Sequence, residues 1–400
     1  MKIEERFINY VKFDTQSDDA STTTPSTMKQ KELAKYLVEE LKGLGIDNAF
    51  MNEYGEVYAS IDANCEGKDR IGFIAHMDTA PDCSGKDVKP RIVVNYQGGD
   101  IQLNEHVVLS PKDFSNLNKH IGEDLIVTDG TTLLGADDKA GIAIIMNMAE
   151  YVLTHPEVKH GYIGIAFTCD EEVGRGADDF DLETFKCDYA YTVDGGDVNG
   201  IAYENFNAYG ALVSIQGRSV HPGDAKHKMI NASLVGMEFH NCLDSYKNPA
   251  ITEGYEGFYH LTDFDGQCEQ AKLSYILRDH DYDKVLSYIE EFKNAADYLN
   301  KKYKEEIVTC EFKLQYKNMR SIIEQDMRCV DKAMKAISAC GLTPVAEPIR
   351  GGTDGSRLTY EGLNCPNLGT GGENYHGKFE YVSIQNMNTM VDILINIITQ

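Results

Sequence analysis

Residues 140–170 have the sequence AGIAIIMNMAEYVLTHPEVKHGYIGIAFTCD. Residues 140–155 predict a helix that opens directly after a glycine-containing loop, and GYIGIAFTCD is a short apolar run typical of a buried strand. Two similar apolar runs, RIGFIAHMD at 70–78 and DYAYTVDGG at 188–196, also end in polar or glycine residues. Strands that are separated by helices predict an α/β fold with a mixed, mostly parallel sheet and helices on both faces.

The segment 206–317 follows another pattern and predicts a second domain. It reads as strand, helix, two adjacent strands with a hairpin signal near Asp265-Gly266, helix and strand. Its second helix carries apolar residues at spacings of three and four from Val285 to Tyr303. The order βαββαβ predicts a ferredoxin-like α+β lid domain, inserted into a main domain formed by 1–205 and 318–400. The polar tract STTTPST at 21–27 predicts a surface loop.

The composition limits the classes of function. No apolar run approaches the roughly 18 residues of a membrane span, and the N-terminus carries charges where a signal peptide needs an apolar stretch. The ten cysteines include no CxxC pair, which favours reduced thiols in the cytoplasm. A net charge of −26 argues against nucleic acid or membranes as partners.

Acid, base or metal-binding side chains stand at five places, each where a predicted strand or loop ends. They are His76 and Asp78, Asp137, Glu171 and Glu172, Asp194, and His376. The carboxyl ends of parallel strands meet at one edge of a sheet, where ligands bind. Two histidines and several carboxylates that converge there are typical of a two-metal hydrolase site.

Each place also has a simpler interpretation. His76 and Asp78 share one face of a strand, so the acid could orient the ring, or the two could form a packing pair. Asp137 and Asp138 stand at a helix mouth, where one carboxylate could cap the helix and the other could bridge two cations. His376 lies in a glycine-rich segment and, taken alone, is best interpreted as a surface loop residue.

The three adjacent acids of TCDEEVG repel one another and need a counter-charge, since no basic residue lies near them before Arg175. In an extended strand, Glu171 and Glu172 would face opposite ways, so one could bind a metal and the other act as general base. The alternative is a solvated acidic turn. Asp194 follows an apolar strand, and two glycines after it allow close backbone approach.

Together, HMDT, GADDKAG, DEEVGRGA, YTVDGG, NFN, HPG, IRGGTDG and NYHGK resemble the motifs of the zinc-dependent M20 peptidase family over nearly the whole chain. EGYEGFYH and PIRGGTDGSRL are similar to the branch that removes the N-terminal residue from tripeptides. The resemblance implies two zinc ions per subunit, one held by His76 and Asp194, the other by Glu172 and His376, with Asp137 between them. It also implies that Asp78 orients His76 and that Glu171 is the general base.

The resemblance further implies a catalytic role for the main domain and a lid and dimer-contact role for 206–317. His221 in SVHPG would stabilise the oxyanion, within its own subunit or from the neighbouring subunit of a homodimer, and Arg278 and Arg350 would anchor a peptide carboxylate. An M20 dipeptidase or deacylase would keep the same ligands and differ in its substrate pocket. A catalytically silent peptide-binding protein is disfavoured because Glu171 and all five ligand positions are present.

Overall fold

The computed structural model describes residues 1–400 and divides the chain into two units. Unit 1 comprises Met1–Tyr203, Ser321–Glu347 and Thr353–Gln400, and unit 2 comprises Glu204–Arg320 and Pro348–Gly352. The return of residues 348–352 to unit 2 was not predicted, because the sequence pattern of the inserted domain ends at residue 317.

Unit 1 is built on an eight-stranded sheet whose four central strands, β8, β3, β9 and β16, run parallel. Antiparallel pairs flank them at β1–β2, β2–β8 and β10–β16, and β15 runs parallel to β10 at the far edge. In spatial order the strands are β1 (Phe50–Met51), β2 (Val57–Ile61), β8 (Ile163–Thr168), β3 (Ile71–His76), β9 (Tyr189–Gly195), β16 (Asn367–Gly369), β10 (Gly200–Ala202) and β15 (Val345–Ala346). The prediction of a mixed, mostly parallel sheet is confirmed.

Helices cover both faces of this sheet, as predicted. On one face Phe73 of β3 stacks on Tyr191 of β9 at 5.9 Å, and the Tyr191 hydroxyl donates to the carbonyl of Cys329 in the helix α8 (Arg328–Ala339). The next residue of β3, Ile74, points to the other face. It packs in a buried cluster with Phe185 of the helix α4 (Leu182–Phe185) and Leu358 of the helix α9 (Asp354–Tyr360). All six residues of β3 are buried, which explains its continuous apolar run.

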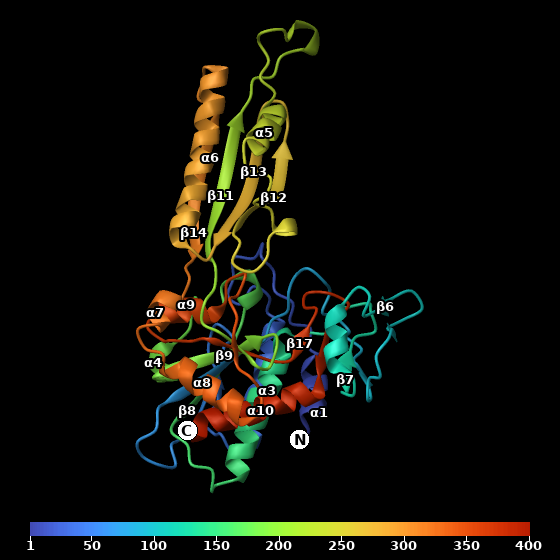
Figure 1. Cartoon of the computed structure of the whole chain (residues 1–400), viewed down its shortest axis with the longest axis vertical. Helices are drawn as coiled ribbons and strands as arrows, with labels where there is room; N and C mark the ends of the chain where they lie inside the picture. Colours follow the sequence, from blue (N-terminus) through green and yellow to red (C-terminus); the bar gives the residue numbers. More distant parts are fainter. The chain divides into compact units, whose positions relative to one another are not determined.

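The helices of unit 1 surround the sheet (Figure 1). They are α1 (Ile3–Tyr10), α2 (Gln30–Gly43), α3 (Ala136–Thr154), α4 (Leu182–Phe185), α8 (Arg328–Ala339), α9 (Asp354–Tyr360) and α10 (Ile384–Thr399), and α7 (Arg320–Ile323) spans the point in the chain where unit 2 ends. Short 3-10 turns lie at η1 (Ser115–His120) and η2 (Glu171–Val173). The helix α3 packs against β3 and β9, so its N-terminus lies close to the ends of these strands.

A second, small antiparallel sheet of unit 1 was not predicted. Its strands, in order, are β17 (Gly372–Glu373), β18 (Tyr381–Ser383), β7 (Leu125–Val127) and β4 (Arg91–Val93), and a separate pair is formed by β5 (Ile101–Gln102) and β6 (Val108–Leu109). The sheet matters for the site because the connection between β17 and β18 contains His376.

Unit 2 has the predicted ferredoxin-like order of elements. They are β11 (Asn207–Gln216), α5 (Ala232–Asn241), β12 (Phe258–Gly266), β13 (Gln270–Asp279), α6 (Tyr282–Tyr303) and β14 (Val308–Tyr316), with 3-10 turns η3 (Pro222–Asp224) and η4 (Pro249–Ile251). The strands form an antiparallel sheet in the order β12-β13-β11-β14. The apolar face of α6, with Phe292 at its centre, packs on this sheet.

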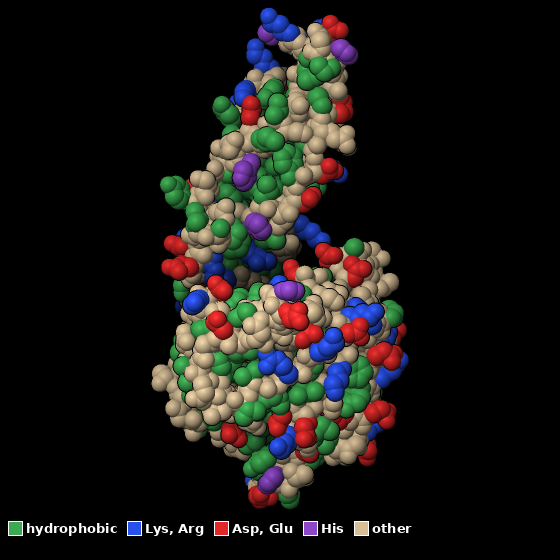
Figure 2. All heavy atoms as spheres, turned by 90° about the vertical axis from the view of Figure 1, so that its right-hand side faces the viewer, with side chains coloured by type: hydrophobic (Ala, Val, Ile, Leu, Met, Phe, Trp, Pro, Cys, Tyr) green, Lys and Arg blue, Asp and Glu red, His purple; other side chains and the backbone are tan.

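Charged side chains of both signs lie on the surface of the protein (Figure 2). Acidic and basic side chains alternate with apolar ones on the face drawn in Figure 2. None of the helices combines the length and the apolar content that crossing a membrane requires.

Candidate metal centre

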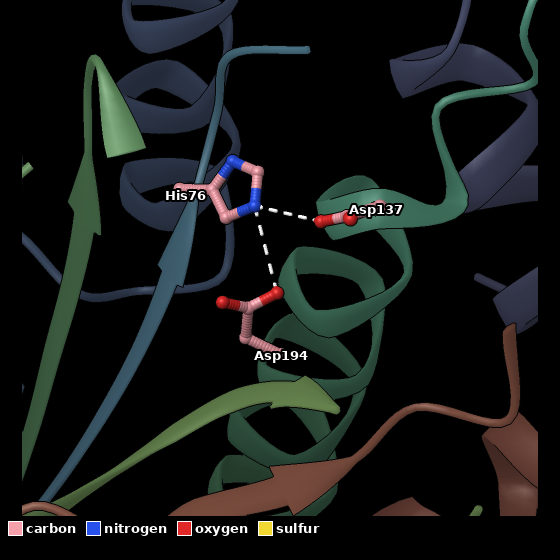
Figure 3. A group of neighbouring side chains, drawn as sticks. All are labelled: His76, Asp137 and Asp194. Carbon is pink, nitrogen blue, oxygen red and sulfur yellow. Dashed lines mark hydrogen bonds and ion pairs between the residues drawn. The ribbon is translucent and has the colours of Figure 1, made fainter. Parts of the chain in front are cut away.

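His76 is the last residue of β3 and lies at the carboxyl edge of the parallel strands. Its side chain is only 2% exposed, and its Nε2 lies 2.8 Å from Asp137 Oδ1 and 3.5 Å from Asp194 Oδ1 (Figure 3). Its Nδ1 lies 3.1 Å from the carbonyl oxygen of Asp78 and 3.3 Å from Asp78 Oδ1. The ring is therefore fixed on one side and presents Nε2 to two carboxylates on the other.

Asp137 stands between the two histidines. Its Oδ1 faces His76, and its Oδ2 lies 3.4 Å from His376 Nε2. Burial opposes ionisation, but the two histidines lower the pKa of Asp137 below its ordinary value. The neighbouring Asp138 does the capping instead, because its Oδ1 accepts from the backbone N–H of Gly141 and its Oδ2 from that of His76, each at 3.2 Å.

Glu171 and Glu172 form the 3-10 turn η2 after β8, so the expectation that both lie in an extended strand is wrong. The strand ends because Asp170 adopts a left-handed backbone with φ of 63°. The Asp78 carboxylate accepts from the backbone N–H groups of Glu171 and Glu172, both at 3.1 Å. Asp78 therefore contacts both His76 and this turn, whereas the sequence predicted only the contact with the histidine.

A buried hydrogen-bond cluster holds the same turn from its other side. The Asp170 carboxylate accepts from the backbone N–H of Ser26 at 2.6 Å, from the Ser26 hydroxyl at 2.5 Å and from Gln30 Nε2 at 2.7 Å. Ser26 is buried, so the tract 21–27 is not simply a surface loop. Sequence reasoning missed this cluster because nothing in STTTPST indicates a partner more than a hundred residues away.

His376 lies in the β17–β18 connection, in a left-handed backbone conformation with φ of 61°. Its side chain is 45% exposed, and its Nε2 lies 3.0 Å from Glu172 Oε2. Hydrogen bonds to Asp137 and Glu172 raise the pKa of His376 to about 11. The interpretation of an isolated surface histidine therefore does not hold.

Two groups of side chains could each hold a metal ion. The first ligand group is His76, Asp137 and Asp194, and the second is Asp137, Glu172 and His376; within each, the potential ligand atoms all lie within 4.8 Å of one another. Both groups offer the nitrogen and oxygen donors that zinc and related divalent cations accept. They share Asp137, whose two oxygens face different groups.

The electrostatics of the two groups fit bound cations. Burial raises the pKa of Glu172 to about 7 and that of Asp194 to about 6, so a cation beside these carboxylates would favour their ionised forms. In addition, Glu172 Oε1 is buried and has no hydrogen-bond partner. A cation in each group would supply that positive charge and the missing partner.

Glu171 belongs to neither group. Burial, and then the charges of Asp354 and Asp194, raise the pKa of Glu171 well above its ordinary value. Asp354 begins α9 and accepts from the Thr168 hydroxyl at 3.0 Å. Sequence reasoning assigned no role to Asp354, although an acid within the glycine-rich motif IRGGTDG was a usable signal.

The structure thus brings together His76, Asp78, Asp137, Glu171, Glu172, Asp194 and His376 within unit 1, while the other three predicted residues lie in unit 2. His221 is exposed and accepts from the backbone N–H of Gly223 through Nδ1 at 3.2 Å. Arg278 lies in β13, with its guanidinium 5.8 Å from the centre of the Tyr316 ring.

Arg350 is engaged with the loop 252–256 of the same unit. Its Nη1 donates to the carbonyls of Gly254 and Glu256 at 2.6 and 2.9 Å, and its Nη2 donates to the carbonyl and hydroxyl of Thr252 at 3.3 and 3.1 Å. The guanidinium also lies 5.1 Å from the centre of the Phe206 ring. Its contacts are therefore to a loop and to an aromatic ring of the same unit.

Comparison with known proteins agrees with this geometry. The model of peptidase family M20/M25/M40 matches residues 129–400. The chain belongs to this family. It is 53% identical over 399 residues to the Peptidase T of Clostridium perfringens, with 99% of this chain and 98% of that protein covered. The predicted resemblance to M20 peptidases is confirmed.

Two solved structures of M20-type peptidases have a similar fold. The aminopeptidase PepT of Bacillus cereus superposes with a TM-score of 0.77 at 23% identity, covering 100% of this chain and 97% of that one. A dinuclear metal-binding M20 peptidase of Bacillus subtilis superposes with a TM-score of 0.64 at 14% identity, covering 99% and 98%. At these identities the likeness shows the fold alone.

Proposed function

We propose that this M20 protein is a metallo-aminopeptidase that releases the N-terminal residue of tripeptides. One observation carries the proposal: two ligand groups share Asp137, and a carboxylate outside both groups, Glu171, is available as a base. The 53% identity to a Peptidase T over nearly the whole of both chains supports the same branch of the family.

The metal in this proposal is zinc, with two ions per subunit. His76 and Asp194 would hold one ion, Glu172 and His376 the other, and Asp137 would bind both. When bound, such ions polarise a peptide carbonyl and make a water molecule more acidic. The unpaired Oε1 of Glu172 and the bridging position of Asp137 support this assignment.

Glu171 is the general base of the proposed reaction. It would accept a proton from the attacking water and return it to the leaving amino group of the cleaved peptide. Burial and the neighbouring carboxylates raise the pKa of Glu171, which makes it a stronger proton acceptor than an ordinary glutamate. Asp78 would hold the His76 ring and the Glu171–Glu172 turn in fixed positions relative to each other, because its carboxylate contacts both.

Three further roles stay predictions. His221 would donate to the oxyanion, and Arg278 and Arg350 would bind the carboxylate of the peptide, for which Arg350 would have to give up contacts with the loop 252–256. A homodimer with contacts in unit 2, a lid role for that unit and a cytoplasmic location also stay predictions.

The test uses three substrates: trialanine, dialanine and N-acetyl-trialanine. The purified protein is assayed as prepared, after chelation, and after zinc is returned. Release of alanine from trialanine alone, lost on chelation and restored by zinc, is the expected result. Cleavage of the acetylated peptide or of dialanine would instead indicate a deacylase or dipeptidase, and two bound zinc ions without any cleavage would indicate a silent peptide-binding protein.

A further inference from the structure

Glu380 is a buried carboxylate that the proposed reaction does not use. It lies just before β18, four residues after His376, and is 1% exposed. Its Oε2 accepts from the backbone N–H groups of Leu134 and Gly135 at 2.7 and 2.8 Å, and its Oε1 accepts from that of Asp137 at 3.0 Å. The whole carboxylate is therefore committed to the loop that presents Asp137.

The backbone of Glu380 holds the other side of the second ligand group. Its N–H donates to the carbonyl of Gly377 at 3.2 Å and closes a turn directly after His376. One residue therefore connects the turn that carries His376 to the loop that carries Asp137. These two ligands lie 3.4 Å apart, measured from Nε2 to Oδ2.

The loop at 134–137 needs such a partner because its own geometry leaves N–H groups free. Gly135 has a left-handed backbone with φ of 84°, and Asp137 and Asp138 depart from helical angles although they stand at the start of α3. Helix N-termini present unpaired N–H groups, and an anion is a favourable partner for them. Because three N–H groups of this loop donate to the one Glu380 carboxylate, that carboxylate fixes the loop.

We infer that Glu380 is a positioning residue that sets the separation of Asp137 and His376 and thereby the metal affinity of the second ligand group. The inference rests on the proposed metal-dependent function. Glu380 holds the segments of two ligands of the second group, but of only one residue of the first group, Asp137. A change at Glu380 therefore lowers the metal affinity of the second group more than that of the first group.

The test is a calorimetric titration of cobalt(II) into the metal-free protein. His376→Ala first identifies which of two binding steps belongs to the second ligand group. Glu380→Gln keeps the side-chain size but places an amide donor against N–H donors, so it cannot satisfy both Asp137 and the Leu134–Gly135 pair. The expected result is a 10- to 100-fold weaker second-group step, the loss typical of residues that orient metal ligands, with about threefold or less change in the other step.

Glu56→Gln is the matched control. Glu56 is also a buried glutamate of unit 1, is 3% exposed, and is hydrogen-bonded to Asn52 Nδ2 and the Tyr58 hydroxyl, but contacts no candidate ligand. It should leave both binding steps unchanged. A Glu380→Gln protein that unfolds at a lower temperature yet binds cobalt as the wild type does would overturn the inference, as would an equal loss in both steps.

Glu380→Asp covers the case in which the glutamine variant does not fold. Aspartate keeps both oxygens but is shorter by one methylene, so it reaches one side of the loop and should weaken the second-group step relative to the wild type. An unchanged step in this variant would also overturn the inference. A wild-type protein that binds no metal would overturn the proposed function itself, which separates the two failures.

Discussion

The two ligand groups share Asp137 but hold their histidines in different ways. His76 ends a fully buried strand of the main sheet and is 2% exposed, with its ring fixed by Asp78. His376 lies in a loop, in a left-handed conformation, and is 45% exposed. One group is therefore part of the core, whereas the other is assembled on its surface by loops that need additional support.

The largest expected difference lies between the alanine variants of these histidines. His76→Ala leaves buried carboxylates without their partner and should cost the metal-free protein about 3–5 kcal/mol. His376→Ala removes a ring that is 45% exposed from a carboxylate, Glu172, that is 5% exposed, so the loss should be smaller, about 1–2 kcal/mol. Urea unfolding of the metal-free proteins measures both losses in the free energy of unfolding. Equal losses would show that the two histidines do not differ in this way.

Glu171→Gln should leave both groups intact and yet remove activity. Because Glu171 is the proposed base and not a ligand, kcat on trialanine should fall about 10²- to 10⁴-fold while two metal ions stay bound. Metal analysis and steady-state kinetics on the same preparation check this. If the variant retained most of its kcat, the assignment of the base would be wrong.

The stabilisation that bound metal provides should depend more steeply on pH for the second ligand group than for the first. In the metal-free protein the raised pKa values of Glu172, about 7, and Asp194, about 6, contribute stability below pH 4 that is lost as pH rises through these values. Metal binding displaces the protons, so its stabilisation grows with pH, with affinity rising about tenfold per pH unit for each proton displaced.

At pH 7 the second group holds a proton on His376, whose pKa is about 11, and part of one on Glu172. The rise in unfolding temperature on adding zinc, measured from pH 5 to 8, should therefore increase with pH. It should increase less in His376→Ala. A rise that does not depend on pH would show that metal binding displaces no protons from these ligands.

The smallest expected effect concerns the cluster behind the Glu171–Glu172 turn. Ser26→Ala removes one hydroxyl hydrogen bond to the Asp170 carboxylate but keeps the backbone bond and that of Gln30. We expect a loss of about 1 kcal/mol in the free energy of unfolding, measured with urea. Ser21→Ala, in the exposed part of the same tract, serves as the control and should change it by less than about 0.5 kcal/mol.

The same contrast, between residues in regular elements and residues in loops, explains which parts of the fold and of the site could be predicted from the sequence. His76 and Asp194 end apolar strands, so their positions at one sheet edge follow from the parallel order of β3 and β9. The ferredoxin-like order of unit 2 was equally clear, because its hairpin and its long amphipathic helix have local signals. Local patterns thus sufficed where regular elements carry the residues.

The remaining features depend on contacts between distant segments. The left-handed Asp170 turns the chain out of the strand, which no pattern in TCDEEVG indicates. Glu380 reads as an ordinary acid before a short strand, and only the folded chain places it against residues 134–137. The small sheet around His376 was missed because its strands have only two or three residues.

The order of the ligands along the chain has a consequence for synthesis. His76, Asp137, Glu172 and Asp194 are translated before unit 2, whereas His376 and Glu380 follow it. A growing chain therefore carries four of the five candidate ligands before His376 is made, and Glu380 docks on residues 134–137 after that. Both ligand groups are therefore complete only after the segment that follows unit 2 has folded back onto the first part of unit 1.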